Sequence, residues 1–132
     1  MDIPGLKCDA LSVEEIEALP AFYARAAVFA KEVGFSGVQI HAGHGFLLSQ
    51  FLSPLFNLRE DMYGGSIEAR ARILPMIIEA IRQAVGPQFP VSIKFNSTDV
   101  LDGGLVEDDA FEVVRMLDDT SIDLIDISGG TY

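Results

Sequence analysis

Alternating apolar and polar side chains run through Val91-Ser-Ile-Lys-Phe-Asn96. Because successive side chains of a β-strand point to opposite faces, this stretch predicts a strand with one apolar and one polar face. The strands that we expect at 37–42 and 124–128 alternate in the same way, with His41 and Asp126 among their polar residues. A sheet covered by helices on both faces would be apolar on both. The pattern therefore favours a β/α barrel, whose helices lie outside and whose reactive mouth lies where the strands end.

A first helix is predicted ahead of the earliest strand. Ser12-Val-Glu-Glu15 is a capping-box pattern, in which the Ser and Glu side chains satisfy backbone N–H groups at the helix start. We expect Pro20 either to end this helix after a turn or two or to open a second helix as its first residue. Gly34 would stop the helical segment. Its predicted apolar face consists of Phe22, Ala26, Phe29 and Val33.

Two further helices are predicted between the strands. Ser66 is placed to cap the first of them, Pro75 to bend it, and Gly86-Pro87 to end it. The apolar stripe of this helix would be Ile67, Ala71, Leu74, Ile78, Ile81 and Val85, and that of the following helix Val106, Ala110, Val113 and Leu117. Helices that alternate with strands in this order connect parallel strands. The predicted fold class is therefore α/β.

The predicted strands are too few for a closed barrel. A complete (β/α)8 TIM barrel has eight strands and typically ~250 residues, whereas this chain has 132 residues. We interpret residues 1–132 as a fragment of a single domain, a partial TIM barrel with about three of its eight parallel strands. Its outer strands would have unpaired edges, so we expect it to need the missing barrel half or to form an oligomer.

Composition and charge argue against several classes of function. The formal net charge is −11, so phosphate backbones would be repelled and nucleic-acid binding is not expected. No apolar run approaches the ~20 residues of a membrane-spanning helix, and the N-terminus lacks the basic and apolar regions of a secretory signal. Cys8 is the only cysteine, which excludes an intramolecular disulfide. From these features we expect a cytoplasmic protein without a membrane partner.

Two histidines follow closely on the first predicted strand, in His41-Ala-Gly-His44-Gly45. Imidazole donates or accepts protons near neutral pH, so a pair at the end of a strand could hydrogen-bond the oxygen of a small substrate. The alternative is a pair of turn histidines whose hydrogen bonds are satisfied within the protein. A zinc site is less favoured, because no nearby Cys or third His completes a tetrahedron, and no metal is predicted.

Longer motifs surround the histidines. They are the run from Gly34 to Pro54, Asp61-Met-Tyr-Gly-Gly-Ser-Ile-Glu-Ala-Arg70, Phe89-Pro-Val-Ser-Ile-Lys-Phe-Asn96, and Asp126-Ile-Ser-Gly-Gly-Thr-Tyr132. On these motifs the chain resembles the Old Yellow Enzyme family of FMN-dependent NAD(P)H oxidoreductases. The resemblance implies an eight-stranded barrel, of which this segment would supply about the fourth to sixth strands. It also implies FMN as the cofactor, NADH or NADPH as the reductant, and an activated alkene or other electron-poor acceptor as the small-molecule substrate.

The resemblance assigns roles to three residues. His41 and His44 would hold the carbonyl or nitro oxygen of the acceptor, where fixed donors stabilise the negative charge that develops in the transition state. Lys94 takes the place of a basic residue beside the pyrimidine edge of the flavin, where a cation would stabilise the reduced cofactor. An ion pair with Asp126 on the neighbouring strand is the alternative interpretation of Lys94.

One position departs from the family pattern. Many members have a tyrosine two residues after the second member of the pair, which protonates the α-carbon of the substrate. This chain has Phe46 there, which has no hydroxyl group. By the resemblance, either water or another residue would supply the proton, or the substrate is not a simple alkene.

Other residues near the motifs are interpreted as structural. Arg59 and Asp61 would fix the loop before Tyr63, and Tyr63 would belong to a turn. The charges expected on the surface or behind the site are Glu68, Arg70 and Arg72. For the chain as a whole, the competing hypothesis is a catalytically inactive remnant of a barrel that cannot hold FMN alone.

Overall fold

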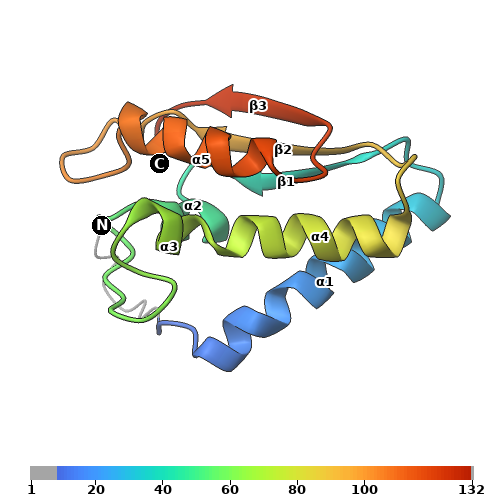
Figure 1. The fold of residues 1–132 in the computed structure, drawn as a ribbon, viewed down its shortest axis with the longest axis horizontal. Helices are drawn as coiled ribbons and strands as arrows, with labels where there is room; N and C mark the ends of the chain where they lie inside the picture. The colour runs from blue at the N-terminus through green and yellow to red at the C-terminus, as the bar shows by residue number, and fades with distance from the viewer. Residues whose placement is uncertain (1–8, 132) are drawn as a thin grey trace.

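Three parallel strands in the order β1-β2-β3 form the sheet of this protein, with the helices on one side of it (Figure 1). The computed structural model describes residues 9–131. The elements in chain order are α1 (Val13–Glu32), β1 (Val38–Ala42), α2 (Leu47–Leu52), α3 (Ile67–Ala71), α4 (Ile73–Val85), β2 (Val91–Asn96), α5 (Glu107–Asp118) and β3 (Leu124–Ser128). Cys8 and Tyr132 lie outside the described residues.

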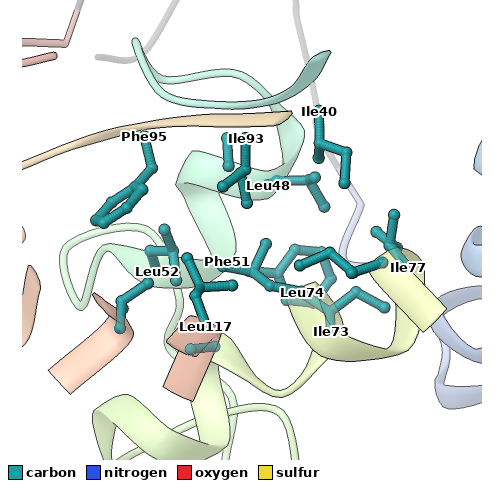
Figure 2. Packing of buried hydrophobic residues seen from close by; sticks show 14 of the residues in the cluster. Ile40, Leu48, Phe51, Leu52, Ile73, Leu74, Ile77, Ile93, Phe95 and Leu117 are labelled. Carbon is teal, nitrogen blue, oxygen red and sulfur yellow. The ribbon is translucent and has the colours of Figure 1, made fainter. Parts of the chain in front are cut away.

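The two faces of the sheet differ as the alternation predicts. In the register of the strands, His41 is paired with Lys94, and Lys94 is paired with Asp126. Because paired residues point to the same face, these three polar side chains form one row across the sheet. Apolar residues of β1 and β2, such as Ile40 and Ile93, face the helices instead (Figure 2). The predicted α/β fold and partial barrel are confirmed.

The hydrophobic core lies between the apolar face of the sheet and the helices. Ile93 and Phe95 are fully buried in β2, and they point toward residues of α2 and α4 that include Leu48 and Leu74 (Figure 2). Each such side chain stabilises the fold by roughly 1.5–3 kcal/mol relative to an exposed one. The core therefore holds the sheet firmly from one side and leaves the opposite face for polar groups.

Helix α1 differs from the prediction in two respects. Pro20 neither ends it nor begins a new helix, because α1 is continuous from Val13 to Glu32 with the proline inside. The packing of Ile16 and Ala27 on either side of Pro20 stabilises the helix despite the missing hydrogen bond. The predicted capping box of Ser12 and Glu15 is confirmed by both of its hydrogen bonds.

The apolar face that we predicted for α1 is exposed. Phe22 and Phe29 are 55% and 64% exposed, whereas Ile16 and Ala27 are buried and Tyr23 packs against the core. Both sets of residues have helical spacing, so periodicity alone does not distinguish them. Contact with α4 decides which of the two faces is buried.

The second predicted helix is divided. Ser66 caps α3 as expected, and a break at Arg72 separates α3 from α4. Pro75 accounts for the break, because it cannot donate to the carbonyl of Ala71 four residues earlier and its ring crowds that carbonyl. The predicted stripe from Ile67 to Val85 is buried throughout. In α5, the predicted residues Ala110, Val113 and Leu117 are buried, whereas Val106 is exposed at the helix start.

Both outer strands have a free side within residues 9–131. A hollow of about 290 Å³ lies beside β1 and is lined in part by Tyr23 and Val38. A second hollow of about 210 Å³ lies beside β3 and includes Phe111 and Ile127, which are 66% and 50% exposed. Such apolar surfaces at the two ends of a sheet are typical of positions where further β/α units would pack.

Candidate active site

The polar row of the sheet brings together side chains that are far apart in the sequence. Nζ of Lys94 lies 2.9 Å from Oδ2 of Asp126, and Nε2 of Gln39 donates a hydrogen bond of 3.3 Å to the same carboxylate oxygen. The ion pair that we considered as the alternative for Lys94 is therefore present. It holds the ammonium group in place beside His41, which is the partner of Lys94 in the strand register.

The electrostatics of this row follow from the ion pair. The hydrogen bond from Lys94 lowers the pKa of Asp126 below its ordinary value, and the charge of the ammonium group adds to the effect. The side chains of Lys94 and Asp126 are 29% and 36% exposed, so solvent screens the pair. The row is thus a charged and accessible surface, and it contributes little to stability.

The two histidines lie next to each other at the end of β1. Their ring centroids are 5.2 Å apart, and the ring planes are tilted by 51°. Nε2 of His44 is hydrogen-bonded to Oγ of Ser128 at 2.7 Å, so the second histidine also touches the end of β3. The ring of Phe46 lies 5.1 Å from that of His41 and is 56% exposed. The sequence reasoning predicted the pair but not its contact with Ser128.

The protonation of His41 is shaped by its surroundings. Burial lowers the pKa of His41, and the nearby groups His44 and Lys94 lower it further. An imidazole with a pKa below 6.5 is mostly neutral at pH 7, so it offers one N–H donor and one acceptor nitrogen. His41 can therefore donate a hydrogen bond to an oxygen without carrying a charge.

A buried polar network supports the turn that carries His44. The side-chain oxygen of Asn96 accepts a 3.2 Å hydrogen bond from the backbone N–H of His44. The amide nitrogen of Asn96 donates to Asp99 and to the carbonyl of Gly130. Burial would raise the pKa of Asp99, but the hydrogen bonds that its carboxylate accepts, including one from Thr131, outweigh it and keep the pKa low. Sequence reasoning missed Asn96 and Asp99 as site residues, although polar residues at the end of a buried strand were a visible signal.

The loop after α2 is organised as predicted. Arg59 forms an ion pair with Asp61, and it also donates to the carbonyl of Leu11. Tyr63 is almost fully buried with its hydroxyl against Met76, which confirms its structural interpretation. Gly64 is required because a Cβ there would overlap the backbone of Arg59.

Arg70, which we expected either on the surface or behind the site, is buried. It is 4% exposed, and its Nη2 lies 2.6 Å from Oδ2 of Asp109 on α5. The Nε and Nη1 atoms of Arg70 have no hydrogen-bond partner among residues 9–131. The ion pair joins α3 to α5. Apolar periodicity could not reveal it, because it depends on contact between two helices.

Within the described range, no group of three or more His, Cys, Asp or Glu side chains is arranged to hold a metal ion. In the same range, none of the helices has the length and hydrophobicity needed to cross a bilayer.

Comparison with known proteins identifies the lineage of this site. Residues 4–132 match the model of the NADH:flavin oxidoreductase / NADH oxidase family. The chain belongs to this family. The resemblance to Old Yellow Enzymes is thereby confirmed, and members of the family use FMN with NADH or NADPH as the reductant.

Individual relatives show the extent of the similarity. The NADH-dependent flavin oxidoreductase iliE of Neonectria sp. is 45% identical over 122 residues, which cover 92% of this chain and 16% of the relative. A 2-naphthoyl-CoA reductase in complex with 2-naphthoyl-CoA superimposes with a TM-score of 0.90 and 37% identity, over 95% of this chain and 19% of that one. The Old Yellow Enzyme homologue of Zymomonas mobilis gives a TM-score of 0.83 and 30% identity, over 92% of this chain and 35% of that one. The chain therefore spans between 16% and 35% of the length of these flavin oxidoreductase relatives.

The residues on the polar face fit part of an FMN molecule. The ring system of a flavin carries carbonyl oxygens and an N–H group along its pyrimidine edge. Lys94 offers an ammonium donor and Gln39 an amide that both donates and accepts, and both side chains contact the carboxylate of Asp126 in the polar row. These two side chains would hold the pyrimidine edge of FMN, which supplies the hydride chemistry of flavin oxidoreductases.

Proposed function

We propose that this chain forms the acceptor-binding wall of an FMN-dependent NAD(P)H oxidoreductase. The substrate would be an activated alkene or another electron-poor acceptor that carries an oxygen atom. The observation that carries the proposal is the common placement of His41, His44 and Lys94 at one open polar face. Family membership supports the reaction class, and a cytoplasmic location stays a prediction from the sequence.

The histidine pair would bind the oxygen of the acceptor. Two rings 5.2 Å apart can both direct a nitrogen at one oxygen atom placed between them. Reduction of the acceptor places negative charge on that oxygen, and donors already in position stabilise the charge without reorganising. The hydrogen bond of His44 to Ser128 restricts the rotation of its ring, which favours a fixed direction.

Lys94 would serve the cofactor side of the site. Bound FMN would supply the hydride-transfer chemistry, with NADH or NADPH as the reductant. The ammonium group of Lys94 would stabilise negative charge at the pyrimidine edge of the ring system. Asp126 keeps the ammonium group at the centre of the sheet, and Phe46 adds an apolar surface beside His41.

A second candidate, an inactive barrel remnant, is favoured by one observation. Among residues 9–131, β1 and β3 each have a free edge, and large side chains such as Phe29 and Phe111 are 64% and 66% exposed. Such surfaces favour self-association over the binding of a cofactor. This candidate predicts oligomers and no specific affinity for FMN.

Titration of the 132-residue chain with FMN distinguishes the two candidates. The proposed function predicts saturable quenching of flavin fluorescence, and bleaching of the bound flavin by NADH or NADPH without oxygen. Lys94→Met should weaken FMN binding, whereas Arg115→Met, which removes an exposed cation on α5, should not. Protein that leaves FMN fluorescence unchanged at every concentration would support the remnant and overturn the proposal.

A further inference from the structure

We propose that Asn96 is a positioning residue for His44. This proposal rests on the proposed function of the histidine pair. Asn96 holds the turn in which the ring of His44 lies beside His41 and is hydrogen-bonded to Ser128. Asn96 would not touch the acceptor. It acts through the backbone of His44.

The backbone of His44 needs such support. Its φ is +59°, a left-handed conformation that residues other than glycine adopt uncommonly. A residue held in that region persists only when the surrounding structure stabilises it. Here the N–H of His44 donates to the side chain of Asn96, and His44 also bridges to Thr131 beyond β3. The turn is therefore held by Asn96 of β2 and by Thr131, which follows β3.

Asn96 is itself held on every side. It is 1% exposed, and its amide nitrogen donates to Gly130 at 2.9 Å and to Asp99 at 3.2 Å. Asp99 is equally buried and accepts further hydrogen bonds from the backbone of Leu105 and from Thr131. A fully satisfied buried network of this kind permits one orientation of the amide. The side-chain oxygen of Asn96 is thereby fixed toward His44.

Gly43 provides independent evidence that the amide and the turn fit closely. A Cβ atom added to Gly43 would lie 2.8 Å from the side-chain oxygen of Asn96, and Cβ atoms in proteins essentially never make non-bonded contacts shorter than 3.0 Å. The glycine before His44 therefore leaves room for the amide, and its own φ lies outside the left-handed region. Glycine is needed at position 43 because the methyl group of an alanine would occupy the space that the Asn96 amide fills.

The experiment follows the imidazole resonances of the 132-residue chain by two-dimensional NMR. His44→Gln identifies the signals of His44, and urea gives their positions in the unfolded chain. Asn96→Ala should move the His44 signals toward the unfolded positions while the chain stays folded. Asn57→Ala is the matched control, because Asn57 is also buried and donates two hydrogen bonds, which go to the carbonyls of Phe51 and Tyr63. It should leave the His44 signals in place.

A double-mutant cycle with Gly43 sharpens the test. Gly43→Ala should shift the His44 signals in the wild-type background, because the new methyl group displaces the amide. In the Asn96→Ala background the same change meets no obstacle and should add no shift. If Asn96→Ala does not fold, a shift in Gly43→Ala alone supports the proposal, and unchanged signals overturn it.

Three results would overturn the proposal: unmoved His44 signals in folded Asn96→Ala, an equal shift in Asn57→Ala, or additive shifts in the cycle. None of them depends on the cofactor. His44 signals that respond as expected in a chain without affinity for FMN would contradict the proposed function and leave the role of Asn96 intact. In chain loaded with FMN, Asn96→Ala should lose acceptor affinity and keep its affinity for FMN.

Discussion

Lys94 and Asp126 face each other on neighbouring strands, with Nζ and Oδ2 2.9 Å apart. The pair lies in the same row as His41, so the cation of the site is already bound to a carboxylate. A flavin at this face would share the ammonium group with Asp126. The carboxylate thus orients Lys94 and also limits how strongly it attracts an anionic cofactor.

Removing the ammonium group should change the titration of Asp126. In Lys94→Met we expect the pKa of Asp126 to rise toward its ordinary value of 3.8, because the hydrogen bond from Lys94 is the largest cause of its lowering. Carboxylate carbon resonances followed against pH measure this shift. Arg115→Met is the control with the same change in net charge, and it should leave Asp126 unaffected. A pKa of Asp126 that does not move in Lys94→Met would show that the ion pair is absent in solution.

The lowered pKa of His41 predicts a pH-dependent loss of stability. The folded state binds fewer protons than the unfolded chain below the ordinary pKa of 6.5, so protonation favours unfolding there. The free energy of unfolding should therefore be at its full value above pH 6.5, fall as the pH drops from 6.5 toward the lower pKa of the folded state, and level off below that pKa. Urea denaturation of wild type and His41→Gln at several pH values isolates the contribution of His41 to the pH dependence of the free energy of unfolding. Parallel curves for the two proteins would contradict the prediction.

Pro20 inside α1 offers a gain in stability. Proline in a helix interior removes one hydrogen bond and destabilises the helix by about 3 kcal/mol relative to alanine. Part of this loss is offset because proline also lowers the conformational entropy of the unfolded chain. We expect Pro20→Ala to raise the free energy of unfolding by about 1–2 kcal/mol in urea denaturation. Pro87→Ala, in the turn after α4, should bring no gain. A Pro20→Ala chain that is less stable than wild type would show that α1 is broken at that residue.

The buried ion pair of Arg70 and Asp109 predicts an asymmetry between two variants. Asp109→Ala leaves a charged guanidinium group buried without its partner, which costs about 3–5 kcal/mol. Arg70→Met removes the buried charge and leaves a carboxylate that is 24% exposed, so it should cost less. Denaturant midpoints of the two variants test the order. Equal losses would indicate that Arg70 is solvated in solution.

Much of the fold was predictable because the strands carry a strict alternation. The predicted 91–96 and 124–128 agree with β2 and β3, and the stripe of α4 is buried as expected. Errors arose where two patterns competed. In α1, both the Phe22 face and the Ile16 face have helical spacing, and only contact with α4 selects between them. The short helix α2 was not predicted, because six residues are too few to show a period.

The sequence predicts which residues belong to the candidate site, but not the contacts that hold them in place. The sequence motifs point to His41, His44 and Lys94, and the register places His41 beside Lys94. Their functional roles stay predictions. The contact between His44 and Ser128 and the network of Asn96 involve segments that are far apart in the chain, so no local pattern could reveal them.

Binding of one acceptor oxygen by both imidazole rings can be followed in a single titration. Cyclohexanone, a ketone without an activated double bond, would be added to the FMN-loaded chain while the ring resonances of His41 and His44 are recorded. If both rings bind the oxygen, both sets of signals move together with one dissociation constant. Replacing both histidines by alanine should weaken binding by about tenfold or more, since two hydrogen bonds of ~1 kcal/mol each are lost. Signals of either histidine that stay fixed while cyclohexanone binds, or equal affinity in the double variant, would contradict it.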